Sequence, residues 1–213
     1  MTTPATASPV HILPFTGRHR LEALSDGIYA IALTLLVLEL KVPVLPHDAS
    51  EHAVIEALVG VLPKAMTWLF SFWVMIVFWQ SQLRVFRFSV RIDYSMMWLE
   101  LIQLALISLL PFTSAVLGEY GAYRAPYALY SAHLMLMGLL SVRRTEHMLR
   151  HTELHAPELS PAVARSLRIR VWTLLGCSTG AFLLAFIIAP LNMFAMLPTA
   201  LLSRLAPIKA ENA

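Results

Sequence analysis

The amino-acid sequence predicts an all-α membrane protein with six transmembrane helices, the sixth of them short, and with both termini in the cytoplasm. Of its 213 residues, 58% are hydrophobic and only 14% are charged, and the mean hydropathy is +0.67. An ordinary globular chain is about half apolar and about a quarter charged. A bilayer is therefore the expected surrounding, and the small formal net charge of +3 gives no indication of nucleic-acid binding.

The first predicted helix is the hardest to justify by hydropathy. Between Asp26 and Glu39 lie only 12 uncharged residues, fewer than the roughly 20 that cross a hydrocarbon core of about 30 Å. By length alone, the segment 27–38 is typical of a buried helix. If it spans the membrane, its acidic ends lie at or near membrane depth, where they need partners or a water-filled cavity.

Helices two to six are predicted from long stretches without Asp, Glu, Lys or Arg. These stretches are 65–83, 101–118 and 125–142, and a last one that runs from 171 to the first charged residue, Arg204. The last stretch is too long for one helix, and its Pro190-Leu191-Asn192 turn divides it into a full span followed by a short one. Together with the segment 27–38, these stretches bring the number of predicted spans to six.

The positions of Lys and Arg indicate how the helices are oriented. With the N-terminus inside and the spans alternating, 13 of the 16 basic residues fall on the cytoplasmic side, and only Lys41, Lys64 and Arg124 fall outside. Cytoplasmic loops carry such an excess, so we expect a multi-pass protein of the plasma membrane. The predicted parts are a cytoplasmic tail at 1–17, a six-helix domain at 18–205, a second tail at 206–213 and a longest outer loop at 41–57.

The first helix is predicted to carry one apolar stripe. Each residue of a helix advances by about 100°, so Ile31, Leu35 and Leu38 fall within a narrow stripe. Asp26 lies about 140° round from Ile31, on a different face. If Ser25 and Asp26 are buried, they need partners on another helix or subunit. The alternative is that both residues cap the start of the helix at the membrane surface.

The run RLEALSDGIYAIALTLLVLEL at 20–40 resembles the first helix of the transmembrane protein 175 family, which contains lysosomal potassium channels and their bacterial single-repeat relatives. The family's signature is Arg, three residues and then Phe-Ser-Asp. Here it is Arg20, three residues and then Leu24, Ser25 and Asp26, with Leu in place of Phe. The segments FSFWVMIVFW (70–79), IDYSMMWLELIQLALISLLPFTSAVLGEY (92–120) and ALYSAHLMLMGLL (128–140) are similar to the family's second, third and fourth helices.

This resemblance implies a cation channel that favours potassium and assembles as a homotetramer, with the first helices around the central axis. It also implies that rings of apolar side chains form the constriction and gate, and by position these are Ile31, Leu35 and Leu38. The sequence has no TVGYG-like carbonyl filter. Thr34, one turn from Ile31, is the candidate for selectivity because four hydroxyls could partly replace an ion's water. The alternative is that its hydroxyl bonds to the carbonyl of Ala30.

Two polar residues depart from the pattern of the family that the chain resembles. Gln82 stands where relatives carry His at the end of the second helix, and Glu100 stands where they carry Asn in the third. In such channels both positions are partners of the signature, so we expect a rewired hydrogen-bond network around Ser25 and Asp26. Glu100 and Asp26 would repel each other if they were close and both ionised.

Two other classes of function stay open. A secondary transporter or proton-conducting pathway is suggested by titratable groups at membrane depth, which are Asp26, Glu39, Glu100 and His133. A transporter would be expected to show inverted repeats, and none is seen. The second alternative is a non-conducting membrane scaffold. Catalytic nucleophiles, paired carboxylates and phosphate loops have no recognisable spacing, so an enzyme is not expected.

Neither a cofactor nor a metal site is predicted, and potassium is the expected permeant ion. The expected partners are other copies of the chain, the lipid bilayer and monovalent cations. His147, His151 and His155 recur at a spacing of four residues, but a solvated helix extension explains this pattern better than a metal site does. Cys177 is alone in an apolar stretch, where we expect it to pack or to face lipid.

Overall fold

The computed structural model describes residues 15–157, 159–187 and 199, and these residues form five long helices. The helices are α1 (Phe15–Leu35), α2 (Glu51–Phe88), α3 (Tyr94–Glu119), α4 (Arg124–Arg150) and α5 (Pro161–Ile187). A short 3-10 turn, η1 (Leu36–Glu39), continues α1. No strand occurs in the part of the chain that the structure describes, apart from an isolated bridge between Ser89 and His155.

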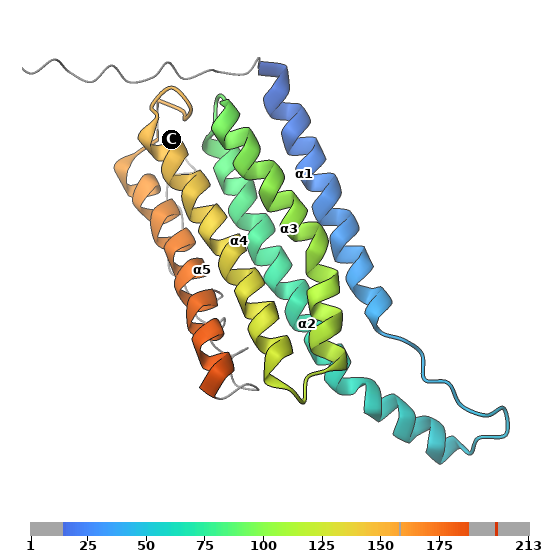
Figure 1. The fold of residues 1–213 in the computed structure, drawn as a ribbon. Coiled ribbons are helices and arrows are strands. Elements are labelled where there is room, and N and C mark those ends of the chain that lie inside the picture. Colours follow the sequence, from blue (N-terminus) through green and yellow to red (C-terminus); the bar gives the residue numbers. More distant parts are fainter. Residues whose placement is uncertain (1–14, 158, 188–198, 200–213) are drawn as a thin grey trace, which may run out of the picture.

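The five helices lie side by side and alternate in direction (Figure 1). At the end where α1 begins, here called the N-terminal end, lie the connections 89–93 and 151–160. The connections 40–50 and 120–123 lie at the opposite end, here called the far end. Each of the five helices is long and apolar enough to cross a membrane. The prediction of an all-α membrane protein is therefore confirmed.

The predicted bounds of the membrane domain meet the structure only in part. α1 begins at Phe15, inside the predicted tail 1–17, because the helix extends well before its uncharged segment. α5 ends at Ile187, at the far end of the bundle. The predicted sixth span and the predicted tail 206–213 lie outside the described residues, apart from Thr199.

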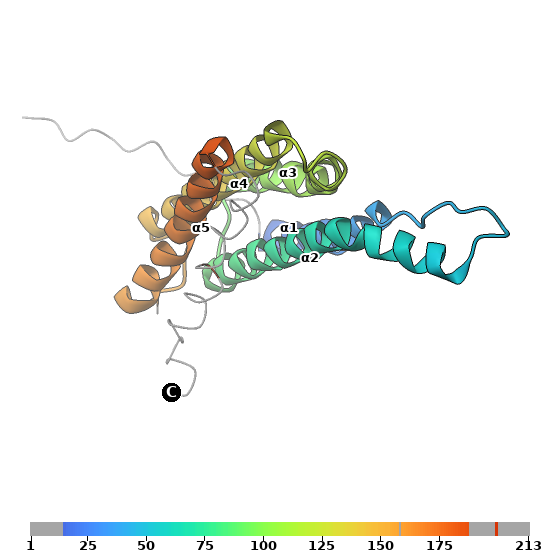
Figure 2. The same ribbon diagram turned by 90° about the horizontal axis from the view of Figure 1, so that it is seen from below.

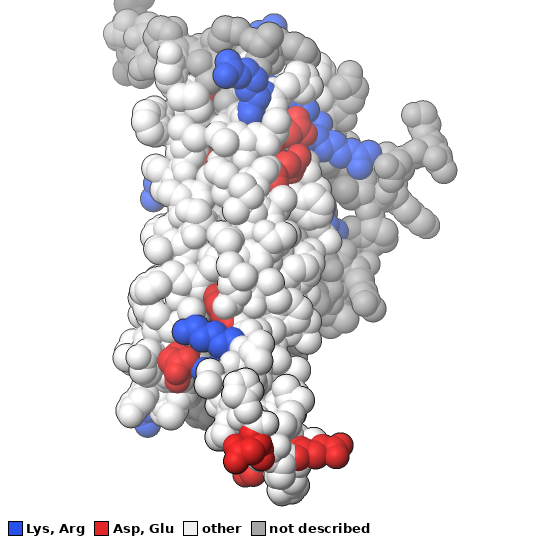
Figure 3. Space-filling model, turned by 90° about the vertical axis from the view of Figure 1, so that its right-hand side faces the viewer, with Lys and Arg blue, Asp and Glu red and all other residues white. Residues whose placement is uncertain are grey.

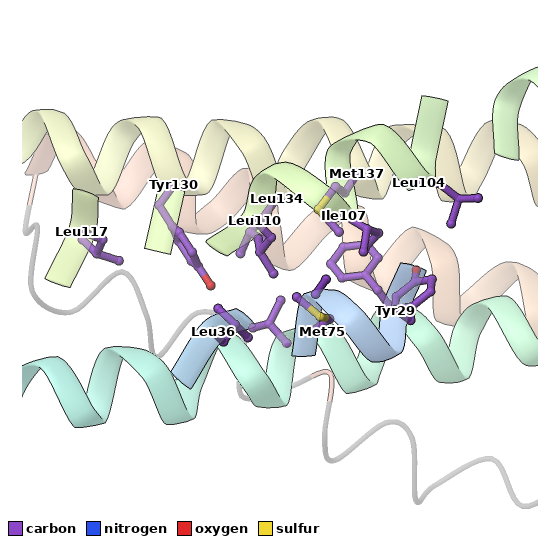
Figure 4. Close-up of a cluster of buried hydrophobic side chains, with 13 residues drawn as sticks. Tyr29, Leu36, Met75, Leu104, Ile107, Leu110, Leu117, Tyr130, Leu134 and Met137 are labelled. Carbon is purple, nitrogen blue, oxygen red and sulfur yellow. The ribbon is translucent and has the colours of Figure 1, made fainter. Parts of the chain in front are cut away.

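The main core forms where α1 meets α2, α3 and α4 (Figure 4). Its largest fully buried side chains include Tyr29 and Leu36 from the first helical segment, Met75 and Phe78 from α2, and Ile107 from α3. Burial of these side chains fixes one face of α1 against the bundle.

Polar side chains join three helices within this core. The Ser71 hydroxyl lies 2.8 Å from the Ser114 hydroxyl and 2.9 Å from the Tyr130 hydroxyl. All three residues are buried. Hydrogen bonds of this kind add to packing between membrane helices, which gain little from the hydrophobic effect alone.

The first part of α2 differs from the sequence prediction. The predicted outer loop at 41–57 ends at Ser50, because the helix already begins at Glu51. The Ser50 hydroxyl accepts a hydrogen bond from the backbone N–H of Ala53 at 3.3 Å and so caps the helix start. Glu51, one of the three acidic residues in the predicted loop, sits in the first turn of the helix, where negative charge is favourable. Pro63 stands inside this helix.

α4 and α5 pack closely at a glycine. A Cβ atom added at Gly138 would lie 3.1 Å from the Cα of Leu175 and 3.2 Å from the Ser178 hydroxyl oxygen. Such distances are tighter than ordinary van der Waals contact. The absence of a side chain at Gly138 therefore lets the two backbones approach, as small residues do at membrane helix interfaces.

Candidate functional site

α1 presents two different faces. Its buried residues recur at helical spacing and pack against the bundle; they are Leu21, Ser25, Tyr29, Ala32 and Leu36. The predicted stripe lies on the opposite face, where Ile31 is 60% exposed, Leu35 43% and Leu38 69%. Large apolar side chains on this face have no partner within the described chain that buries them. The face is therefore available for lipid, for a pore or for another copy of the protein.

The end of the stripe has a geometry that sequence periodicity does not give. α1 ends at Leu35, and the next turn is a 3-10 helix from Leu36 to Glu39. In a 3-10 helix the side chains at positions i and i+3 eclipse. Leu38 therefore lies almost directly in line with Leu35 along the helix axis.

Thr34 lies beside the stripe and is exposed. Its hydroxyl donates a hydrogen bond of 2.7 Å to the carbonyl oxygen of Ile31. The back-bond that was weighed as an alternative therefore exists, with Ile31 as its acceptor in place of Ala30. Since the bond uses the hydroxyl proton, the oxygen lone pairs of Thr34 are still open to a cation.

The buried face of α1 is attached to a polar network. The amide nitrogen of Gln82 on α2 donates to the Ser25 hydroxyl at 2.5 Å and also to a carboxylate oxygen of Glu100 on α3. Arg144 on α4 donates to the amide oxygen of Gln82 and to the second carboxylate oxygen of Glu100. The structure thus brings Ser25, Gln82 and Glu100 together and adds Arg144, a residue that sequence reasoning had counted only as a cytoplasmic charge.

The Glu100–Arg144 ion pair is the electrostatic centre of this network. The Glu100 side chain is 1% exposed and the Arg144 side chain 3%. An unpaired charge at such a depth is very unfavourable, so each group depends on the other for neutralisation. The repulsion considered between Glu100 and Asp26 is replaced by this attraction, because Asp26 lies on another face and is exposed.

The other residues of the signature do not join the network. The Asp26 carboxylate accepts a hydrogen bond of 3.1 Å from the indole N–H of Trp79. Arg20 is exposed, and Leu24 is 47% exposed on the same side as Ile31. Only Ser25 of the signature therefore faces the interior of the described chain, while Arg20, Leu24 and Asp26 lie on its surface.

A groove of about 490 Å³ opens at the far end of α1. Its charged lining consists of Glu39, Lys41, Lys64 and Glu119, and its apolar lining includes Phe112 and Val116. The Lys64 amine and the Glu119 carboxylate lie 2.6 Å apart. Glu39, one residue after Leu38, therefore stands beside the stripe in a groove that holds both signs of charge.

The histidines singled out by spacing have local partners. His147 lies 2.7 Å from a carboxylate oxygen of Asp93, whose other oxygen caps α3 through the backbone N–H of Met96. The rings of His147 and His151 stand 4.4 Å apart. His133 is buried, with one ring nitrogen 2.9 Å from the Thr113 hydroxyl. Within 15–157 and 159–187, no group of three or more potential ligands could hold a metal ion.

The fold defines a helical membrane protein, and its relatives place it in a family of ion channels rather than enzymes. Residues 20–111 match the family described as the endosomal/lysosomal potassium channel TMEM175. The chain is also 34% identical to a potassium channel of Streptomyces collinus, over 83% of this chain and 86% of that protein. The chain belongs to the TMEM175 family, as its resemblance at the first helix indicated.

Further relatives differ in how they are described. A potassium channel of Chamaesiphon minutus is 33% identical over 60% of this chain and 64% of that protein. A protein of Danio rerio described as the endosomal/lysosomal proton channel TMEM175 is 29% identical over 57% of this chain, but the match covers only 23% of that longer protein.

Two solved structures are similar to this fold. The crystal structure of a lysosomal potassium-selective channel TMEM175 homolog from Chamaesiphon minutus is 26% identical, with a TM-score of 0.75 over 90% of this chain and 98% of that chain. A variant of the potassium channel MtTMEM175 has a TM-score of 0.54 at 16% identity, over 96% of this chain and 93% of that chain, and supports the fold alone.

Proposed function

We propose that this chain forms a potassium-selective channel in the plasma membrane, as a homotetramer whose α1 helices surround the pore. The observation that carries the proposal is the exposed stripe of Ile31, Leu35 and Leu38 on α1, in a family of potassium channels. In this arrangement the N-terminal end of the bundle, which holds most of the Arg residues, faces the cytoplasm. A sixth, short span within 188–205 then returns the C-terminus to the same side.

The stripe closes the pore by excluding water. Four copies of a branched side chain at one level form an apolar ring, and successive rings at Ile31, Leu35 and Leu38 make a constriction that a hydrated ion cannot enter. A modest rotation or outward movement of the α1 helices widens the rings and lets water in. The polar network supports this role, since Ser25 is held by Gln82 on the opposite face of the helix.

Thr34 supplies the polar element of the constriction. It is exposed beside the stripe, and its hydroxyl proton is already donated to the carbonyl of Ile31. Four Thr34 oxygens at one level of the tetramer therefore offer lone pairs that partly replace the water around a cation.

Ion flux from liposomes tests the proposal. Purified protein reconstituted in potassium-loaded liposomes should release potassium without valinomycin, and Leu35→Ala or Leu38→Ala should increase the flux because the apolar ring becomes wider. Leu109→Ala on α3 is the matched control, since Leu109 is 47% exposed and Leu35 is 43% exposed. Absence of potassium flux at every voltage and pH, or an equal effect of all three substitutions, contradicts a pore lined by α1.

A proton-conducting pathway is the second candidate, and the description of the Danio rerio relative as a proton channel favours it. Its titratable groups would be Asp26, Glu39, Glu100 and His133. The same liposomes, loaded with a pH-sensitive dye and no permeant metal cation, separate the two candidates. Acidification that persists in Leu35→Ala and disappears in Glu39→Gln supports the proton pathway against the potassium pore.

A further inference from the structure

The outer part of α2 leaves the helix bundle. Residues 51–62, which we call the arm, project beyond the other helices in both views (Figures 1 and 2). The whole helix has 38 residues and is about 57 Å long at about 1.5 Å per residue, roughly twice the thickness of a hydrocarbon core. The first buried residue of α2 is Ser71. The arm therefore has no core of its own within the described chain.

The arm is an amphipathic helix with an unpartnered apolar face. Large apolar residues recur along it at the spacing of a helix, and each is more than one third exposed; they are Val54, Ile55, Leu58, Val59 and Leu62. Glu56 and Gly60 lie on the other side of the helix. Such a face is covered in the working protein either by lipid or by another protein surface.

If α1 faces the pore, the direction of the arm favours contact with protein over contact with lipid. In Figures 1 and 2 the arm extends past α1, on the side away from α4 and α5. Figure 3 looks at this side, where the middle of the surface is almost free of charged atoms and Asp and Glu atoms gather at the lower tip. In the proposed tetramer this side faces the common axis and the adjacent copies. The surroundings of the arm are then protein and water.

The length of the arm is sufficient to reach an adjacent copy. Its 12 residues extend about 18 Å at about 1.5 Å per residue. Packed helices lie about 8–10 Å apart. The arm therefore crosses the gap between two helices that meet around the axis and still presents one to two turns to the next chain.

We propose that the arm of each copy docks on the far-end groove of the adjacent copy, so that the tetramer is clasped around the outer mouth of the pore. The apolar lining of that groove includes Phe112, which is 59% exposed, and Val116. These residues receive the apolar face of the arm. The acidic residues Glu51 and Glu56 of the arm, with Asp48 just before it, complement the exposed Lys41 in the lining of the groove. This inference rests on the proposed function, because it requires α1 to face a shared axis.

Cross-linking between two differently tagged copies tests the docking. Both copies carry Cys177→Ser, which removes the native thiol; one adds Leu58→Cys on the arm and the other Phe112→Cys in the groove. After co-expression and oxidation in intact membranes with copper phenanthroline, we expect a disulfide-linked pair that carries both tags. The matched control replaces Phe112→Cys with Leu183→Cys, which is equally exposed on α5 at 59% and should give less than about a tenth of that product.

The outcomes distinguish this inference from the proposed function. A protein that is tetrameric and conducts potassium, but gives no more cross-link with Phe112→Cys than with Leu183→Cys, overturns the clasp and leaves the channel proposal intact. Quenching of a fluorophore at position 58 by lipids that carry a quencher in their acyl chains also overturns it, because the arm is then in the membrane. If the protein without substitutions is not a tetramer and shows no potassium flux, both proposals are overturned.

Discussion

Removing the charge of Glu100 should destabilise the protein strongly, because Arg144 would be left buried without a counter-charge. The side chains are 1% and 3% exposed, and Arg144 would keep only neutral amide oxygens as acceptors, those of Gln82 and of the substituted side chain, with no negative charge. Breaking a buried pair by neutralising one partner costs about 3–5 kcal/mol. In a chain of this size each kcal/mol lowers the melting temperature by about 2–4 °C, so Glu100→Gln should melt about 10 °C below the protein without substitutions.

The double substitution separates this ion pair from ordinary packing effects. In Glu100→Gln combined with Arg144→Met, no buried charge is left, and the new amide can still bond to Gln82. We expect this variant to recover most of the stability, with a coupling free energy between the two sites of about 2–4 kcal/mol. Glu119→Gln is the control, since its partner Lys64 is also exposed and that exposed pair should contribute little.

Melting of five proteins in lipid nanodiscs, followed by tryptophan fluorescence, measures these differences: the unsubstituted protein, Glu100→Gln, Arg144→Met, the double variant and Glu119→Gln. The reasoning is refuted if Glu100→Gln has the same melting temperature as the control Glu119→Gln. It is also refuted if the double variant loses as much stability as Glu100→Gln and Arg144→Met lose in sum. A potassium flux measurement on the double variant then reports on α1. Because Ser25 keeps its bond to Gln82, the flux should stay within about twofold of the unmodified protein.

Three further predictions concern separate parts of the molecule. Thr34→Val keeps the shape but loses the oxygen, so the potassium-to-sodium permeability ratio, measured from reversal potentials, should fall about two- to tenfold. Gly138→Leu should lower the free energy of unfolding by about 1–3 kcal/mol because it forces α4 from α5, whereas Gly176→Leu, with open space around its Cβ position, should not. Asp93→Ala should cost about 1–2 kcal/mol through the lost cap of α3, and Asp93→Asn should restore most of it.

The helical class of the fold follows from the sequence because uncharged segments of sufficient length have few alternatives in a bilayer. The bounds of the helices do not follow from hydropathy alone. α1 is longer than its uncharged segment because charges within it find partners: Arg18 donates to the carbonyl of Phe86 at 2.9 Å and lies 4.0 Å from Glu22. The first part of the arm, 51–57, was predicted as the end of a loop because its segment contains Pro43, Pro46 and three acidic residues, although a capped helix start accommodates an acidic residue well.

The stripe on α1 was predictable because it depends on local periodicity, whereas the network depends on contacts between distant segments. Arg144 is the clearest example. It follows Met137 by seven residues and Tyr130 by fourteen, so it lies on the buried face of α4, while Arg143 is exposed. That spacing, together with the carboxylate of Glu100 in α3, which needs a partner at membrane depth, was a signal that could have identified Arg144. Counting both arginines as topology markers concealed it.

In the proposed pore, the change from α-helix to 3-10 helix after Leu35 would let the ring of Leu38 move separately from the rings of Ile31 and Leu35. Three residues turn through about 360° in a 3-10 helix and through about 300° in an α-helix. If η1 rewound as a continuation of α1, Leu38 would swing about 60° around the helix while Ile31 and Leu35 kept their directions. In the proposed pore, Leu38 could then widen or narrow its own ring without any tilt of α1.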